Sequence, residues 1–149
     1  MADRSVHARQ LEARKASPVG GPSVVLVGYD RTDGSSHALS YAAGLAGRTG
    51  ARLVVLNVDA SLALDCATGV RACVDDIAGE VAQVVAGGGE GCEVAVDVGD
   101  AASVIQRIAR ELQVDLIVVG QSRHRWMHPF GSVTARLAHR AEHPVLIVP

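Results

Sequence analysis

The chain has 149 residues, of which 48% are hydrophobic, 20% charged and 3% aromatic, and its formal net charge is −2. This length suits one domain, and the composition is too apolar for a disordered chain and too charged for a membrane protein. No segment approaches the roughly 20 consecutive apolar residues of a transmembrane helix, and a slightly acidic chain has no bulk attraction for nucleic acid. We therefore expect a globular domain that binds neither membranes nor nucleic acid.

The cysteines and histidines give no pattern of a disulfide or metal site. Cys66, Cys73 and Cys92 are odd in number and follow no Cys-x-x-Cys spacing, so packed, reduced thiols are the better interpretation. His124 and His128 are four residues apart, but no third ligand accompanies them. Reduced thiols, without the apolar core of a signal peptide near the N-terminus, suit a reducing compartment. We predict a cytoplasmic protein without a metal centre.

Residues 1–22 have the character of a tail. They are polar, lack a sustained apolar period and end in the breaker-rich segment 17–22. We predict a flexible N-terminal tail over 1–22 and one domain over 23–149.

Within the predicted domain, buried strands alternate with amphipathic helices. Short β-branched runs predict strands buried on both faces, and an apolar period near 3.6 predicts the helices. The predicted strands cover residues 24–28, 53–58, 92–98, 116–120 and 145–148. The predicted helices cover residues 38–47, 70–86, 101–112 and 131–141, with Asp33, Ser35 or Ser36 as caps of the first, Gly50 after its end and Asp100 as cap of the third. Alternating polar and apolar residues in 92–98 indicate a strand near a sheet edge.

This alternation predicts an α/β fold: a single doubly wound, five-stranded parallel sheet with helices on both faces. Ligands of such sheets bind beyond the carboxyl ends of the strands, where the strand order reverses. The candidate site residues are therefore those that directly follow the strands.

Two strand ends carry suitable chemistry. Asp30 follows the first strand, and its carboxylate can accept hydrogen bonds from ribose hydroxyls or an exocyclic amine; alternatively, it caps the following turn. Gly120 ends the fourth strand, and Gly131, Ser132 and Val133 open the next helix. Glycine amides and a helix N-terminus can bind phosphate, whereas the simpler alternative is a turn followed by a serine cap.

Three stretches match a known family: VVLVGYDRTDGSSHALSYAAGLA, LVVLNV and DLIVVGQSRHRWMHPFGSVTARLAHRAEHPVLIVP. Through them, residues 23–149 resemble the universal stress protein family. The resemblance implies an adenine-nucleotide α-hydrolase-like fold, in which some members bind ATP and others do not. It also implies a regulatory binding module of the stress response rather than an enzyme.

The ATP-binding members of the family carry G-x2-G-x9-G-[ST] after the fourth strand. Gly120 matches the first glycine, and Gly131 and Ser132 match the last glycine and the hydroxyl. Arg123 replaces the second glycine, and the loop that follows it has seven residues instead of nine. The phosphate motif of this chain is therefore divergent.

The resemblance further places Asp30 at the base or ribose, Val58 in the adenine pocket and Val119 near the ribose. Arg123 and Arg125 can bind phosphate through paired donors, so the loop could hold ATP or another adenine nucleotide by charge. Three alternatives stay open: a smaller cyclic or monophosphate nucleotide, loss of nucleotide binding, and an Arg123 side chain that fills the phosphate space.

The alternative functions are a dimeric stress protein that acts through protein partners and a weak ATPase of the same fold. Enzymes of the wider class that resemble this fold carry a histidine pair or a Ser-Gly-Gly loop after the first strand, and residues 29–34 contain neither. Family members commonly pair through the last strand. Residues 145–148 are apolar, and at a sheet edge they would expose an unpaired ladder, so we predict a homodimer through this strand.

Overall fold

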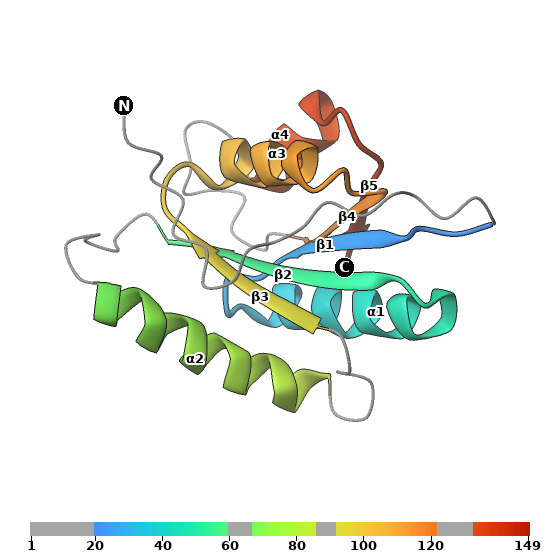
Figure 1. Ribbon diagram of the computed structural model, residues 1–149. Helices are drawn as coiled ribbons and strands as arrows, with labels where there is room; N and C mark the ends of the chain where they lie inside the picture. Colours follow the sequence, from blue (N-terminus) through green and yellow to red (C-terminus); the bar gives the residue numbers. More distant parts are fainter. Residues whose placement is uncertain (1–19, 60–66, 86–91, 122–132) are drawn as a thin grey trace.

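The computed structural model describes residues 20–59, 67–85, 92–121 and 133–149. Its strands are β1 (Val24–Gly28), β2 (Arg52–Val58), β3 (Cys92–Asp97), β4 (Leu116–Gly120) and β5 (Val145–Val148). Its helices are α1 (Asp33–Thr49), α2 (Ala67–Val84), α3 (Ala101–Glu111) and α4 (Val133–Arg140). The strands form one parallel sheet in the order β3-β2-β1-β4-β5, which confirms the predicted fold class (Figure 1).

The sheet separates two apolar cores. Successive side chains of a strand point to opposite faces, so Val24 and Leu26 pack in one core while Val25 and Val27 pack in the other. The first core is completed by α3 and α4, and the second by α1 and α2, which lie on opposite sides of the sheet (Figure 1). Burial on both faces explains the nearly continuous apolar runs of the central strands.

Helix α1 begins earlier than the sequence pattern predicts. It starts at Asp33 rather than Ala38, and its cap is Thr32, whose Oγ1 accepts a hydrogen bond from the Ser35 amide at 3.2 Å. Ser35 is buried, but its hydroxyl donates to the Thr32 carbonyl and accepts from the Asp30 amide, so burial leaves no polar atom unpaired. The apolar pattern misses this first turn because its buried face carries a serine.

The other predicted boundaries agree with the structure to within a few residues. Asp100 caps α3 through the Ser103 amide, as predicted. Gly50 ends α1 in the left-handed conformation with a φ of 70°, which glycine adopts without strain. β3 lies at one edge of the sheet, as its alternating pattern indicated, and β5 lies at the other.

Two glycines bring β4 and α1 into direct backbone contact. A Cβ atom on Gly120 would overlap the carbonyl group of Gly34 and lie 2.7 Å from the Ser35 nitrogen. Likewise, a Cβ atom on Gly34 would lie 2.9 Å from the Gln121 carbonyl oxygen. The end of β4 and the first turn of α1 can therefore pack this closely only because neither glycine has a side chain.

Gly120→Ala is therefore expected to lower the free energy of unfolding by about 2 kcal/mol or more, since an extra methyl group in a filled site costs about 1–3 kcal/mol. Gly47→Ala in α1 is the control, because a Cβ atom there meets nothing within 4 Å. It should leave stability unchanged or raise it, as alanine favours helices over glycine by about 1 kcal/mol. Urea unfolding checks both variants, and a Gly120→Ala protein as stable as wild type would contradict the close approach.

Candidate functional site

A cavity of about 370 Å³ opens at the carboxyl ends of the strands. It lies between β1 and β4, the point at which the strand order reverses, as the fold class predicts. Its walls come from the ends of β1, β2 and β4, the turn before α1 and the first turns of three helices. The lining residues are Gly28, Tyr29, Asp30, Thr32, Asp33, Gly34, Ser35, Leu56, Val58, Ala101, Ile105, Val119, Gly120, Gln121, Val133 and Thr134.

Five of the eight site residues predicted from the sequence line this cavity: Asp30, Val58, Val119, Gly120 and Val133. They come from β2, β4, α4 and the turn after β1, so the fold brings together positions that are up to 103 residues apart in the chain. The other three, Arg123, Gly131 and Ser132, lie outside the described residues, as does Arg125.

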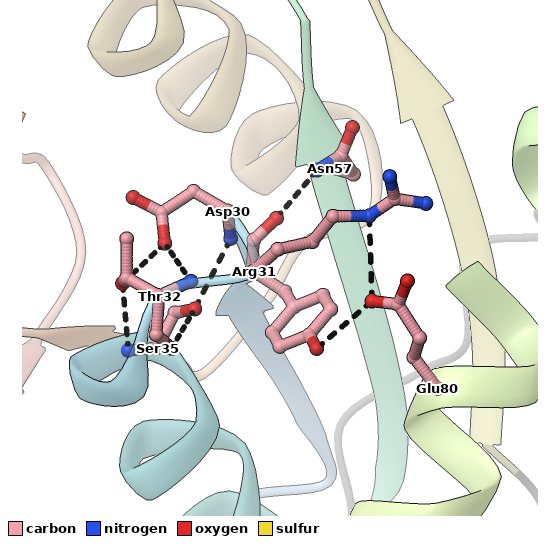
Figure 2. Close-up of polar contacts among 7 residues, drawn as sticks. Asp30, Arg31, Thr32, Ser35, Asn57 and Glu80 are labelled. Carbon is pink, nitrogen blue, oxygen red and sulfur yellow. Dashed lines mark hydrogen bonds and ion pairs between the residues drawn. The ribbon is translucent and has the colours of Figure 1, made fainter. Parts of the chain in front are cut away.

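The Asp30 carboxylate is fixed by the turn that follows β1. Its Oδ1 accepts hydrogen bonds from the Thr32 amide at 3.1 Å and from the Thr32 hydroxyl at 2.6 Å. Figure 2 shows the second oxygen, Oδ2, directed away from this turn, and no donor among the described residues binds it. Asp30 therefore caps the turn with one oxygen, and within the described residues its other oxygen is left for a ligand.

The two sides of the cavity differ in charge. Asp30 and Asp33 place two carboxylates beside the first turn of α1. On the opposite side, the first turn of α4 carries no acidic residue, and the Thr134 hydroxyl donates to the Gly120 carbonyl at 2.9 Å. Carboxylates repel phosphate and accept hydrogen bonds from hydroxyl or amino groups. An anionic group is therefore best accommodated on the α4 side.

The family model for the universal stress protein family matches residues 23–149. The chain belongs to the universal stress protein family. No curated protein matches it.

Solved structures of universal stress proteins resemble this chain. One, in complex with cAMP, is 26% identical, with 87% of this chain and 98% of that chain covered and a TM-score of 0.70. A second, a family member from Burkholderia pseudomallei, is 29% identical, with 85% and 96% covered and a TM-score of 0.61. A third, from Archaeoglobus fulgidus in complex with dAMP, is 18% identical, with 85% and 96% covered and a TM-score of 0.59, and shows the shared fold.

The sequence pattern missed part of the cavity wall in this universal stress protein. Thr32, Asp33 and Ser35 line the cavity because α1 begins five residues earlier than predicted. The spacing of Thr32 and Ser35 was the available signal, since a threonine cap accepts from an amide two or three residues later. Ala101 and Ile105 carried no comparable signal, because α3 reaches the cavity only through tertiary packing.

The described residues contain no group of three or more His, Cys, Asp or Glu side chains that could hold a metal ion. Cys73 and Cys92 are free and half-buried there, and burial raises the pKa of the Cys92 thiol to about 11. Cys66 lies outside the described residues. No helix in the described part of the chain has the length and apolar character required to cross a bilayer.

An ion pair beside the cavity joins α3 to α4. The Arg136 guanidinium donates from both terminal nitrogens to the Asp100 carboxylate, at 2.5 and 2.8 Å. Asp100 also caps α3, and Val133 of α4 lies on the cavity wall one turn before Arg136. The hydrogen bonds from Arg136 and then Ser103 hold the pKa of Asp100 well below its ordinary value of 3.8.

Asp100→Asn, which keeps a capping side chain but removes the charge, should lower the free energy of unfolding slightly at pH 7. Because the folded-state pKa lies below the unfolded value, the stabilisation is complete above about pH 4 and is lost as the pH falls further. The difference in free energy of unfolding between wild type and Asp100→Asn, measured with urea, should therefore become smaller below pH 4. Arg136→Gln should lower the free energy of unfolding by the same amount, and Arg140→Gln on the same helix should not lower it. A loss of stability that does not depend on pH would show that the ion pair between Asp100 and Arg136 is not its cause.

Proposed function

We propose that this universal stress protein is a regulatory binding module that holds an adenine nucleotide in the cavity between β1 and β4. The observation that carries the proposal is the position of Asp30, whose fixed carboxylate has one oxygen without a donor among the described residues, in a cavity that combines apolar side chains of β2, β4 and α3 with a few polar groups. The volume of about 370 Å³ lies in the range of small-ligand sites. Apolar walls with a few oriented polar groups are typical of such sites.

In the proposed complex, each part of the nucleotide meets a different strand end. Leu56 and Val58 of β2 contact the adenine ring, and Asp30 Oδ2 accepts a hydrogen bond from the ribose or the base. Val119 lies near the ribose. The phosphate lies at the start of α4, beside Gly120 and Val133, away from the carboxylates on the α1 side.

The comparisons support an adenine nucleotide and favour a small one. The 26% identical universal stress protein was solved with cAMP, and the Archaeoglobus fulgidus protein of the same fold was solved with dAMP. Each of these ligands carries one phosphate group. A single phosphate also suits the divergent motif of this chain, in which Arg123 replaces a glycine and the loop is shorter.

Binding without catalysis is the better proposal for this cavity. The described lining residues include no histidine, cysteine or lysine, and the hydroxyls of Ser35 and Thr134 donate to main-chain carbonyls rather than to a general base. Hydrolysis of bound ATP, the alternative, would be detected as nucleoside diphosphate released during the binding assay.

Calorimetry with ATP, AMP and cAMP tests the proposal. Asp30→Asn keeps an acceptor for Thr32 and should weaken binding by about tenfold, because it removes a charged acceptor worth about 1.5–3 kcal/mol. Arg123→Ala should weaken binding by about ten- to a hundredfold, because it removes a charged donor to the phosphate, also worth about 1.5–3 kcal/mol. If Arg123 instead fills the phosphate space, wild type will bind nothing and Arg123→Gly will create binding. Failure of wild type and Arg123→Gly to bind any of the three, with no nucleotide released on denaturation, would refute the proposal.

We further propose a homodimer that pairs through β5. This strand lies at the sheet edge, and Ile147, one of two large hydrophobic residues that are exposed in the described part of the chain, is 39% exposed. An apolar edge strand with an open hydrogen-bonding ladder favours pairing with a second copy.

Light scattering at micromolar concentration should give twice the chain mass of 15.4 kDa. Ile147→Lys should yield a folded monomer, because charge on an edge strand prevents edge-to-edge pairing. Tyr41→Lys, which adds the same charge on α1 rather than on the sheet edge, should remain dimeric. A monomeric wild-type protein would contradict this proposal.

A further inference from the structure

The turn that carries Asp30 contains a backbone conformation that its sequence does not favour. Arg31, between Asp30 and Thr32, has a φ of 66°. This left-handed region is uncommon for a residue with a long side chain, because the Cβ atom crowds the following carbonyl oxygen. Such a conformation persists only when surrounding contacts determine it. Both neighbours of Arg31 line the cavity, so its conformation sets where their side chains point.

The contacts that surround Arg31 converge on one carboxylate of α2. The Oε2 atom of Glu80 accepts a hydrogen bond from the Tyr29 hydroxyl at 3.2 Å and lies 3.3 Å from Arg31 Nε (Figure 2). Tyr29 and Arg31 are the residues on either side of Asp30. The Glu80 side chain, 49 positions away from Arg31 in the sequence, therefore contacts both neighbours of the proposed ligand-binding aspartate.

The backbone of Tyr29 is fixed from the opposite direction. The Asn57 side-chain amide donates to the Tyr29 carbonyl at 2.8 Å, and the Tyr29 amide donates to the Leu56 carbonyl at 2.9 Å. Tyr29 is only 5% exposed, so its ring cannot shift without opening the core. The turn thus has a rigid start at Tyr29, while Arg31 is held through its exposed side chain by Glu80.

We infer that Glu80 is a positioning residue for the nucleotide site: by binding Arg31 and Tyr29 it holds the turn in the form that presents Asp30 and Thr32 to the cavity. The inference rests on the proposed function, because it assigns Glu80 an effect on ligand affinity. The side chains of Arg31 and Glu80 are 45% and 40% exposed, so their ion pair contributes little to global stability. A positioning role therefore predicts a change in local order and in affinity while the melting temperature stays nearly constant.

The test compares Glu80→Gln with Asp76→Asn. Both variants remove one negative charge from α2, and Asp76 is exposed one turn before Glu80. Glu80→Gln should weaken binding of AMP and cAMP in calorimetry by about three- to fivefold, the range that an exposed ion pair supports. Asp76→Asn should bind like wild type. Equal affinity in wild type and Glu80→Gln, or equal losses in both variants, would overturn the inference.

A second measurement needs no ligand and separates this inference from the proposed function. Amide hydrogen exchange of Asp30 and Thr32, whose amides donate to Ser35 Oγ and Asp30 Oδ1, should be faster in Glu80→Gln and unchanged in Asp76→Asn. Unchanged exchange in Glu80→Gln would overturn the inference whether or not wild type binds a nucleotide. If wild type binds none, only the proposed function fails, and faster exchange still supports the positioning role.

Rescue by a second substitution distinguishes positioning from a direct charge effect. Glycine adopts a positive φ without strain, so Arg31→Gly reduces the need for an external hold on the turn. In the Arg31→Gly background, Glu80→Gln should therefore change the affinity less than it does in wild type. An undiminished loss would show that Glu80 does not act through Arg31.

Discussion

The contact between the end of β4 and the first turn of α1 determines the shape of the ligand-binding end. Gly120 and Gly34 lie backbone against backbone, and a side chain on either would meet main-chain atoms that cannot rotate away. Both glycines line the cavity at the point where the strand order reverses. Their contact also brings the carboxylates of the α1 turn and the start of α4 to the two sides of one cavity. Gly120 thus has a packing role in addition to any contact with phosphate, so a glycine here does not by itself indicate ATP binding.

The ion pairs near the cavity are largely exposed to solvent, unlike the two apolar cores on either side of the sheet. Arg31 pairs with Glu80, Arg107 with Asp97, and Arg136 with Asp100. Each pair ties a loop or helix at the cavity end to a neighbouring element, and five of the six side chains are at least one-third exposed. Exposed pairs stabilise a fold little but restrict local geometry. The sheet is therefore held by apolar burial on both faces, whereas the cavity end is held by contacts that open at lower cost.

The contrast between the buried sheet and the polar contacts at the cavity end explains how far the sequence could predict the structure. The central strands were predictable because burial on both faces leaves only apolar residues, and Asp100 and Gly50 were predictable because caps act locally. The strand ends located Asp30, Val58 and Gly120, since topology alone places them together, whereas Val119 came from the resemblance to the family.

The features that could not be predicted from the sequence depend on contacts between distant residues or on buried polar groups. The early start of α1 depends on a serine that is buried yet fully hydrogen-bonded. The pairing of Glu80 with the β1 turn joins separate elements and leaves no local signal. The roles of Arg123, Gly131 and Ser132 remain predictions from the family motif.

The same strand end connects the proposed nucleotide site with the proposed dimer edge. Gly120 pairs with Val148, and the Gln121 amide donates to the Val148 carbonyl at 2.7 Å. Gly120 and Gln121 also line the cavity. A nucleotide that orders Gly120 and Gln121 would affect β5 through the main-chain hydrogen bonds between β4 and β5. The two apolar cores would not need to change. Occupancy and pairing are linked only if the ligand binds the paired form and the single chain with different affinities, and β4 is the element through which such a difference would act.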